Sequence, residues 1–361
     1  MNLVIVQPVF TQYRRAAFEW IGRRLDTTLV VSRAEHSDGF GDATNLDNVK
    51  LVTLDKERSV GGVKIQPGVS SFIFRSRPDI VLTFANPRYL TFWLNAWICM
   101  LFGIDFIAHG QGLFRHEKPS LFTRTAFRLL LWHVHYYICY NTFCLESTEP
   151  WVGQAKSKLR KVENSVTNLF PVVAEQKNYH CNGILFIGRQ RDAESLISLI
   201  ATVERIRNSD GVDLTLNIIG ASGDALSNLL RRPLPLWVRA YGTVYDQEEI
   251  ARISVDCFCA CYPGNAGLSV VHYMSLSLAP IVHKNMRDHQ GPEPAIVDHM
   301  VNGILFDPKS DCIGMESAIH ALVMNRELAK ELGTAAFERY RVLETTPLGE
   351  QFVNILSELK H

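Results

Sequence analysis

Short apolar runs alternate with stretches of helical periodicity along almost the whole chain. The runs at 3–6, 79–83 and 105–109 predict buried strands, and apolar residues recur every three or four positions in the stretches that separate them. A second series of the same kind begins at 183–188, after an irregular stretch at 169–179 that we interpret as a linker. This alternation is typical of parallel sheets covered by helices on both faces. The sequence therefore predicts an α/β fold of two doubly wound, Rossmann-like parallel-sheet domains.

The length of 361 residues suits two cores better than one. We expect residues 1–170 to form the first domain and 171–345 the second. The last stretch, 346–361, is expected to be a helix that packs back on the first domain.

Charge is balanced over the chain but uneven between its halves. The formal net charge is zero, which argues against a nucleic-acid-binding protein. Residues 1–165 hold 20 Lys and Arg against 14 Asp and Glu, and the remainder reverses the balance. A basic first half favours anionic acceptors or lipid head groups, and a solvated surface without a partner explains it equally well.

The eight cysteines form no CxxC pair, so we expect free core thiols in a reducing, cytoplasmic compartment. Cys257, Cys259 and Cys261 alternate along one predicted strand, which places all three on one face and makes a zinc site improbable. The chain starts directly with a strand, so we expect no signal peptide. The longest apolar run, 89–103, is too short to span a bilayer.

Two polar loops follow neighbouring predicted strands in the second half. The first, Gly264 to Leu268, lies between a strand at 256–262 and a helix at 269–276, and the second lies at 290–293 after a strand at 279–283. A glycine turn between strand and helix leaves N–H groups free to bind phosphates. Two such loops at the carboxyl ends of parallel strands define a ligand crevice. The residues of the first loop are Gly264, Asn265, Ala266, Gly267 and Leu268.

The stretch from Tyr262 to Phe306 resembles the donor-binding half of GT-B glycosyltransferases, specifically family 4. Gly267-Leu268, Pro280-Ile-Val282 and Asn302-Gly-Ile-Leu305 match the family pattern, whereas Gly264 and His272 stand where the family has two glutamates. The variant with a helix histidine and a later Gly-Pro-Glu is similar to one found in bacterial surface-polysaccharide transferases. The resemblance implies that the two domains face a central cleft.

The resemblance also implies an activity. It is the retaining transfer of a sugar from a nucleotide-sugar donor to an acceptor hydroxyl of a glycan or lipid-linked glycan, in the assembly of lipopolysaccharide, O-antigen or capsule. The nucleotide-sugar is a substrate, so no cofactor is expected. The sequence has no DxD or HExxH motif, so we expect no catalytic metal.

On the donor side, Gly188-Arg189 resembles the family's strand-Gly-Arg, whose arginine binds the diphosphate. The family lysine that follows is missing, and Arg191 is either its replacement or an ordinary surface residue. His272 and Glu293 are candidates for the ribose, although Glu293 also suits a helix start. The loop that meets the base through its backbone is predicted to comprise Tyr241, Gly242, Thr243 and Val244.

On the acceptor side, His109 and Gly110 end a strand and resemble the family histidine at the sugar side of the cleft. With Arg189, His109 is the predicted catalytic residue. Tyr13 and Arg14 open a helix after the first strand, where the usual glycine loop is missing. They meet the acceptor or the diphosphate, or they form an ordinary polar helix start.

One surface property and two other functions remain to be considered at this point. Aromatic helices between 88 and 128 lie beside basic residues, which suits peripheral attachment to an anionic membrane on the inner face of the cell membrane, although core packing also explains the aromatics. The absence of the family glutamates allows a non-catalytic GT-B protein that binds a glycan or a partner enzyme. An epimerase of the same fold lacks support, because no paired acids are found.

Overall fold

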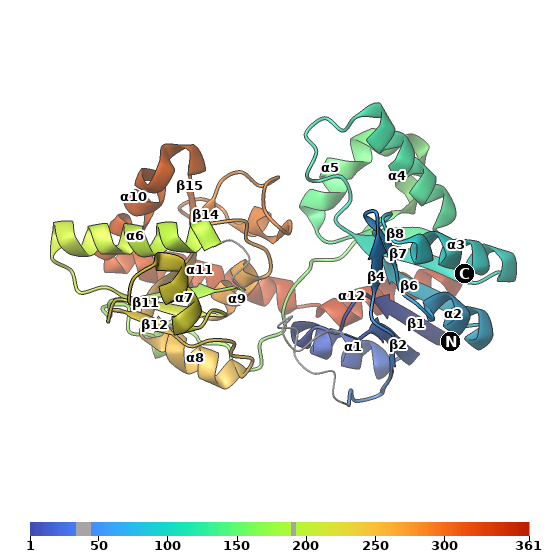
Figure 1. The fold of residues 1–361 in the computed structure, drawn as a ribbon, viewed down its shortest axis with the longest axis horizontal. Helices are drawn as coiled ribbons and strands as arrows, with labels where there is room; N and C mark the ends of the chain where they lie inside the picture. The colour runs from blue at the N-terminus through green and yellow to red at the C-terminus, as the bar shows by residue number, and fades with distance from the viewer. Residues whose placement is uncertain (34–44, 189–192, 361) are drawn as a thin grey trace. The chain divides into compact units, whose positions relative to one another are not determined.

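The computed structural model of this chain describes residues 1–33, 45–188 and 193–360, with the backbone alone at 193, 310–313 and 360. It contains two compact units (Figure 1). Unit 1 comprises Met1–Thr167 together with Thr346–His361, and unit 2 comprises Asn168–Thr345. Each unit is built around its own parallel sheet, so the expected α/β fold of two Rossmann-like domains is confirmed.

The sheet of unit 1 has seven strands in the order β3-β2-β1-β6-β7-β8-β9, all parallel. Both of its faces are buried. Val4 and Val6 of β1 point into one apolar cluster, and Leu3 and Ile5 point into the other. The strands are β1 (Asn2–Gln7), β2 (Asp26–Ser32), β3 (Val49–Leu54), β6 (Ile80–Phe84), β7 (Asp105–Gly110), β8 (Tyr136–Cys139) and β9 (Leu159–Lys161). A separate hairpin consists of β4 (Arg58–Val60) and β5 (Val63–Ile65).

The two faces of this sheet are covered by different helices. On one face lie α1 (Arg15–Gly22) and α12 (Leu348–Ser357). A Cβ added to Gly349 of α12 would lie 2.7 Å from the carbonyl oxygen of Ala17, so the glycine permits the close approach of these two helices. The opposite face carries α2 (Val69–Ser76), α3 (Leu90–Phe102), α4 (Leu121–His133) and α5 (Thr142–Val152).

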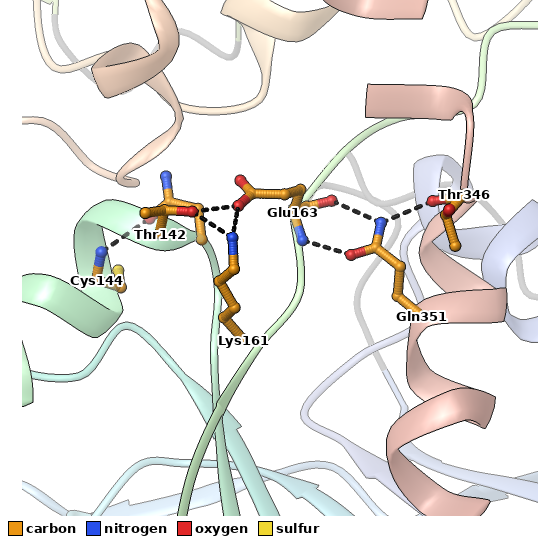
Figure 2. A network of polar contacts seen from close by, with 7 residues as sticks. Thr142, Cys144, Lys161, Glu163, Thr346 and Gln351 are labelled. Atoms are coloured by element: carbon orange, nitrogen blue, oxygen red, sulfur yellow. Dashed lines mark hydrogen bonds and ion pairs between the residues drawn. The ribbon is translucent and has the colours of Figure 1, made fainter. Parts of the chain in front are cut away.

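A polar network holds the returning C-terminal segment to the stretch after β9 (Figure 2). The side-chain oxygen of Gln351 accepts the N–H of Glu163 at 2.6 Å, and its amide nitrogen donates to the carbonyl oxygens of Thr346 and Glu163. Lys161 donates to the Glu163 carboxylate at 2.9 Å and to the hydroxyl of Thr142 at 2.6 Å. The segments by which the chain leaves and re-enters unit 1 are therefore joined within that unit.

The sheet of unit 2 has six parallel strands in the order β12-β11-β10-β13-β14-β15. They are β10 (Gly183–Ile187), β11 (Thr215–Ile219), β12 (Val238–Ala240), β13 (Cys257–Tyr262), β14 (Ala279–His283) and β15 (Ile304–Phe306). One face packs on α6 (Ala193–Asp210), α7 (Gly223–Leu230) and α10 (Asp311–Met324), and the other on α8 (Gln247–Val255) and α9 (Ser269–Ser275). The long helix α11 (Arg326–Glu344) packs beside α9.

The expectation that three cysteines share one face of β13 is wrong. The register between β10 and β13 shifts at Cys257, so that Gly183 pairs with Cys257 and Ile184 with Cys259. This bulge places Cys257 in the cluster on one face, whereas Cys259 and Cys261 join the cluster on the other. An extra residue in a strand reverses the alternation beyond it, and sequence spacing does not show where that residue lies.

Strand order locates the switch points of the two sheets. In unit 1 the chain moves outward from β1 to β2 and β3 and then returns to pair β6 with β1. In unit 2 it moves from β10 to β11 and β12 and then returns to pair β13 with β10. Ligands of doubly wound folds bind beyond the carboxyl ends of the strands at such a point. The loops after β1, β10 and β13 are therefore the places to look for a site.

Candidate functional site

Gly188 directly follows β10 at the switch point of unit 2. Its N–H donates to the carbonyl of Ile219 at 3.0 Å. A Cβ on this glycine would lie 2.7 Å from the ring of Tyr262, so a side chain here would displace the tyrosine that ends the neighbouring strand. The predicted phosphate ligands Arg189 and Arg191 come next in the chain and lie outside the described residues.

The loop from Gly264 to Leu268 is bonded to the loop that follows β14. The N–H of Ala266 donates to Nδ1 of His289 at 3.1 Å. The carbonyl of Ala266 accepts the N–H groups of Gln290 and Gly291 at 3.0 and 3.2 Å. Hydrogen bonds thus join the two polar loops predicted from the sequence into one edge of unit 2.

Two histidines that the sequence analysis did not single out hold this edge together. Nε2 of His289 donates to the carbonyl of His283 at 2.9 Å, and the two rings stack with centroids 3.7 Å apart. Nε2 of His283 lies 3.2 Å from the side-chain oxygen of Asn265, which accepts a hydrogen bond from it. Burial, followed by the neighbouring His283, lowers the pKa of His289 to about 3, so this ring stays neutral and can accept the N–H of Ala266.

Glu293 begins η5 (Glu293–Ile296) and is buried, with 3% of its surface exposed. Its carboxylate lies against both glycines of the joined loops. A Cβ built on Gly267 would be 3.6 Å from Oε2, and one built on Gly291 would be only 2.0 Å from the same atom. The structure therefore brings Glu293 and the Gly264–Leu268 loop together, and Gly291 provides the space for that carboxylate.

His272 lies on α9, one turn after the same loop. Its N–H donates to the carbonyl of Leu268 at 3.1 Å, which continues the loop into the helix. Nε2 is buried and has no hydrogen-bond partner among the described residues. Burial lowers the pKa of His272 to about 4, so the ring is neutral at physiological pH. A buried polar atom without a partner costs about 1–3 kcal/mol, and a ligand hydroxyl would remove that cost.

The stretch from Tyr241 to Val244 follows β12. The hydroxyl of Tyr241 donates to the side-chain oxygen of Asn217 at 3.0 Å, so this side chain is held against the sheet. Gly242 has a φ of +68°, and its N–H donates to Ala221 at 3.1 Å. Thr243 is exposed and Val244 packs against the edge of the core.

In unit 1, His109 and Arg14 come from the ends of β7 and the turn after β1, on either side of β6. His109 is 7% exposed, and its ring lies between Tyr140 and Phe352 with centroids 4.4 and 4.8 Å away. Nε2 of His109 and Nη1 of Arg14 are both buried without a partner among the described residues. Burial, and then the charge of Arg14, hold the pKa of His109 well below its usual value, so the ring is neutral.

The other two predicted acceptor-side residues, Tyr13 and Gly110, lie in different environments. Tyr13 is exposed, and the guanidinium of Arg14 lies 5.5 Å from its ring centroid. Gly110 is buried, and a Cβ there would lie 2.5 Å from the hydroxyl of Tyr137 and 2.8 Å from Cβ of Ala85. Packing inside unit 1 thus accounts for this glycine without any ligand.

Within the described part of the chain, no three His, Cys, Asp or Glu side chains gather in a way that would hold a metal ion. The described cysteines are free, and burial raises the pKa of Cys257 to about 12. The buried Cys257 thiol is therefore protonated.

Comparison with known proteins assigns a family to part of the chain. Residues 181–325 match the family model described as glycosyl transferases group 1. The matched stretch contains β10 to β15 of unit 2 and all the donor-side candidates. No curated protein matches the chain.

Solved structures match nearly the whole chain at low identity. The structure of Anabaena Alr3699/HepE in complex with UDP and glucose has a TM-score of 0.71 at 12% identity, over 99% of this chain and 100% of that one. Sucrose-phosphate synthase from Thermosynechococcus elongatus has a TM-score of 0.70 at 15% identity, over 99% of both chains. A putative UDP-N-acetylglucosamine 2-epimerase from Listeria monocytogenes has a TM-score of 0.63 at 12% identity, over 95% of this chain and 94% of that one. The chain therefore has the GT-B fold, and its residues 181–325 are similar to the glycosyl transferases group 1 family.

Proposed function

We propose that this protein is a retaining glycosyltransferase that moves a sugar from a nucleotide-sugar donor to an acceptor hydroxyl of a glycan or lipid-linked glycan in bacterial surface-polysaccharide biosynthesis. The observation that carries the proposal is the joined loop pair of unit 2. There Ala266 is bonded to His289, Glu293 lies against Gly267, and Nε2 of His272 is buried without a partner among the described residues. This edge offers a nucleotide backbone amides, a carboxylate and a neutral imidazole.

On the donor side, the departing diphosphate needs positive charge as the bond to the sugar breaks. Arg189, directly after Gly188, supplies a fixed charge, and the backbone of the Gly264–Leu268 loop supplies oriented N–H groups. Glu293 accepts a hydrogen bond from a hydroxyl of the ribose or sugar, and His272 forms a hydrogen bond with a second hydroxyl. Glu293 and Nε2 of His272 are buried, so their hydrogen bonds to a ligand are little weakened by water.

On the acceptor side, the neutral ring of His109 and the charge of Arg14 act as a pair. The ring is held between Tyr140 and Phe352, so its orientation is fixed before a ligand arrives. A sugar hydroxyl on Nε2 of His109 and a phosphate oxygen on Nη1 of Arg14 would satisfy both buried atoms.

The proposed reaction uses no cofactor and no metal ion. Arginine and backbone amides take the place of a divalent cation at the diphosphate. The acceptor proton passes to the departing phosphate on the same face of the sugar, so no general base of the protein is needed. We place the enzyme in the cytoplasm.

Calorimetric titration with UDP, GDP, ADP and CDP tests the donor half. One of them should bind with a stoichiometry of one and more tightly than its monophosphate, because the second phosphate adds charge-assisted contacts. A chain that binds none of the four under these conditions would not be a nucleotide-sugar transferase. Binding of a glycan without any nucleotide would favour the non-catalytic GT-B protein instead.

A further inference from the structure

Helix α3 of unit 1 is apolar on two sides. Phe92, Ala96 and Cys99 are buried in the core. Leu90, Leu94, Trp97 and Leu101 follow one another at helical spacing on another side and are exposed, Trp97 at 53% and Leu101 at 74%. A surface helix normally turns charged or polar residues outward. This second apolar stripe therefore needs an explanation outside the core.

Helix α4 extends the stripe. Leu129 and Trp132 are exposed at 51% and 65%. The ring of His133 on α4 lies 5.7 Å from that of Trp97 on α3 and 4.8 Å from that of Trp132, so the two helices are in contact at this histidine. We call the set Leu90, Leu94, Trp97, Leu101, Leu129 and Trp132 the α3–α4 apolar surface.

The charged residues within helices α2, α3 and α4 all have one sign. The helices α2, α3 and α4 contain no Asp or Glu among their residues, whereas Arg75, Arg124 and Arg128 lie on them and Arg77 follows α2. Arg75, Arg77 and Arg128 are exposed. Arg77 packs over the ring of Phe74, and Phe74 contacts Phe102 at the end of α3. Arg77 therefore lies beside α3.

We infer that the α3–α4 apolar surface docks unit 1 onto an anionic lipid bilayer, with Trp97 and Trp132 at the level of the head groups. Tryptophan is suited to this depth because its ring is apolar and its N–H is polar. A helix of 13 residues is about 20 Å long, which lets α3 lie along the interface. No helix among the described residues meets the length and hydropathy of a membrane span.

A second copy of the chain fits this surface less well. A symmetric dimer would place the surface against itself and bring the same arginines of both copies together, with no carboxylate on these helices to offset them. Anionic lipid supplies the opposite charge and an apolar layer together. The inference is independent of the proposed transfer reaction, since it rests on unit 1 alone and its test uses no substrate.

Co-sedimentation of the full chain with vesicles tests the inference. The protein should bind vesicles containing 30% phosphatidylglycerol, should bind pure phosphatidylcholine more weakly, and should be released by salt. Changing Arg75 and Arg128 to serine should lower the partition coefficient roughly 30-fold, the typical effect of two basic residues near an anionic surface. Arg341→Ser, an exposed arginine of unit 2, is the matched control and should bind as the wild type does.

The tryptophans are tested separately. Brominated lipids should quench the fluorescence of the bound protein, and the double variant W97F/W132F should stay bound but lose most of this quenching. W97S/W132S should lose binding at least tenfold, whereas Leu236→Ser, at a fully exposed leucine of unit 2, should not. Binding that ignores lipid charge and these variants would overturn the inference. A second outcome would also overturn it. In that outcome the wild type is a dimer in solution, W97S/W132S is a monomer, and neither protein binds vesicles.

Discussion

At the scale of single residues, burial decides the state of the histidines at the candidate site. The folded pKa of His272 is about 4, below the ordinary value of 6.5, because the buried ring disfavours charge. Between these values the unfolded chain binds the proton and the folded chain does not. The contribution of the neutral His272 ring to the free energy of unfolding is therefore fully present above pH 6.5 and is lost as the pH falls towards 4.

His272→Gln removes this titration while keeping a polar side chain. The free energy of unfolding of the wild type should fall more steeply between pH 7 and pH 5 than that of the variant, as measured by urea titration at a series of pH values. The loss of unfolding free energy relative to pH 7 should differ most between the two proteins at the acid end. Parallel pH profiles would show that His272 titrates alike in the folded and unfolded chains.

Arg189 tests the diphosphate assignment, although its placement lies outside the described residues. Arg189→Ala should weaken nucleoside diphosphate binding by about 2 kcal/mol, the usual effect of losing a charge-assisted contact. Arg341→Ala removes an arginine from an exposed ion pair of the same unit and should leave the affinity unchanged. Equal affinities of both variants in calorimetry would remove Arg189 from the site.

Residue identities predicted which residues meet at this edge of unit 2 better than they predicted how the edge is held. The spacing of the two loops placed Gly267 and Glu293 in one crevice, and the structure brings them together. The spacing gave no sign of His289, because this ring bonds a backbone N–H and belongs to no motif. Only the folded chain shows which backbone atom lies opposite a buried side chain.

At the scale of elements, Gly291 controls where the Glu293 carboxylate lies. Gly291→Ala would place a Cβ 2.0 Å from Oε2, and the end of this side chain can move more easily than the backbone. The variant should therefore fold normally and bind the nucleotide-sugar about tenfold more weakly, as expected when one hydrogen bond of about 1.4 kcal/mol is lost. Calorimetry and a thermal melt measure the two effects.

The matched control for this variant is Gly223→Ala, at the first residue of α7. A Cβ there meets nothing closer than 4.0 Å, and alanine suits a helix better than glycine does. It should leave the affinity unchanged and the melting temperature equal or higher. Donor affinity that is unaffected by Gly291→Ala would exclude Glu293 from the ligand.

Helix α12 carries a prediction about stability. Phe352 is buried in the core of unit 1 and packs against His109. Phe352→Ala should lower the free energy of unfolding by about 3–5 kcal/mol, the usual cost of such a cavity. The exposed neighbour Asn354→Ala should change it little. Chemical denaturation of both variants checks this, and equal values would mean that α12 contributes little to unit 1.

The predictability of the elements depended on how plainly each one shows its period. Buried strands such as β1 and β7 were predicted because they are short and wholly apolar. Helix α5 was missed, and it contains Pro150 and a mixed sequence, which mask the helical pattern. Strand β3 was missed as well, because only one of its residues is fully buried. The hairpin β4–β5 has no buried residue in β4 and gives no apolar signal.

At the scale of the whole molecule, the alternation of strands and helices was enough to predict two parallel sheets, and the structure confirms this fold. The fold does not choose the reaction, since similar folds occur in a synthase and in a putative epimerase. The loops and side chains at the switch points must therefore carry the functional assignment.

We expect the proposed transfer reaction to be independent of metal ions. Transfer should proceed at full rate with excess chelator, because arginine and backbone amides are proposed to stabilise the diphosphate. A metal-dependent glycosyltransferase assayed in parallel verifies that the chelator works. Loss of activity that manganese or magnesium restores would contradict this prediction.

The central claim is that this chain transfers a sugar with retention. Proton nuclear magnetic resonance of the reaction, with the nucleotide-sugar chosen by calorimetry and a panel of glycan and lipid-linked acceptors, measures it directly. The account predicts one nucleoside diphosphate released for each new glycosidic bond, and an anomeric proton whose coupling shows the same configuration as in the donor. A product of inverted configuration, or tight nucleotide binding with no transfer to any acceptor, would contradict it.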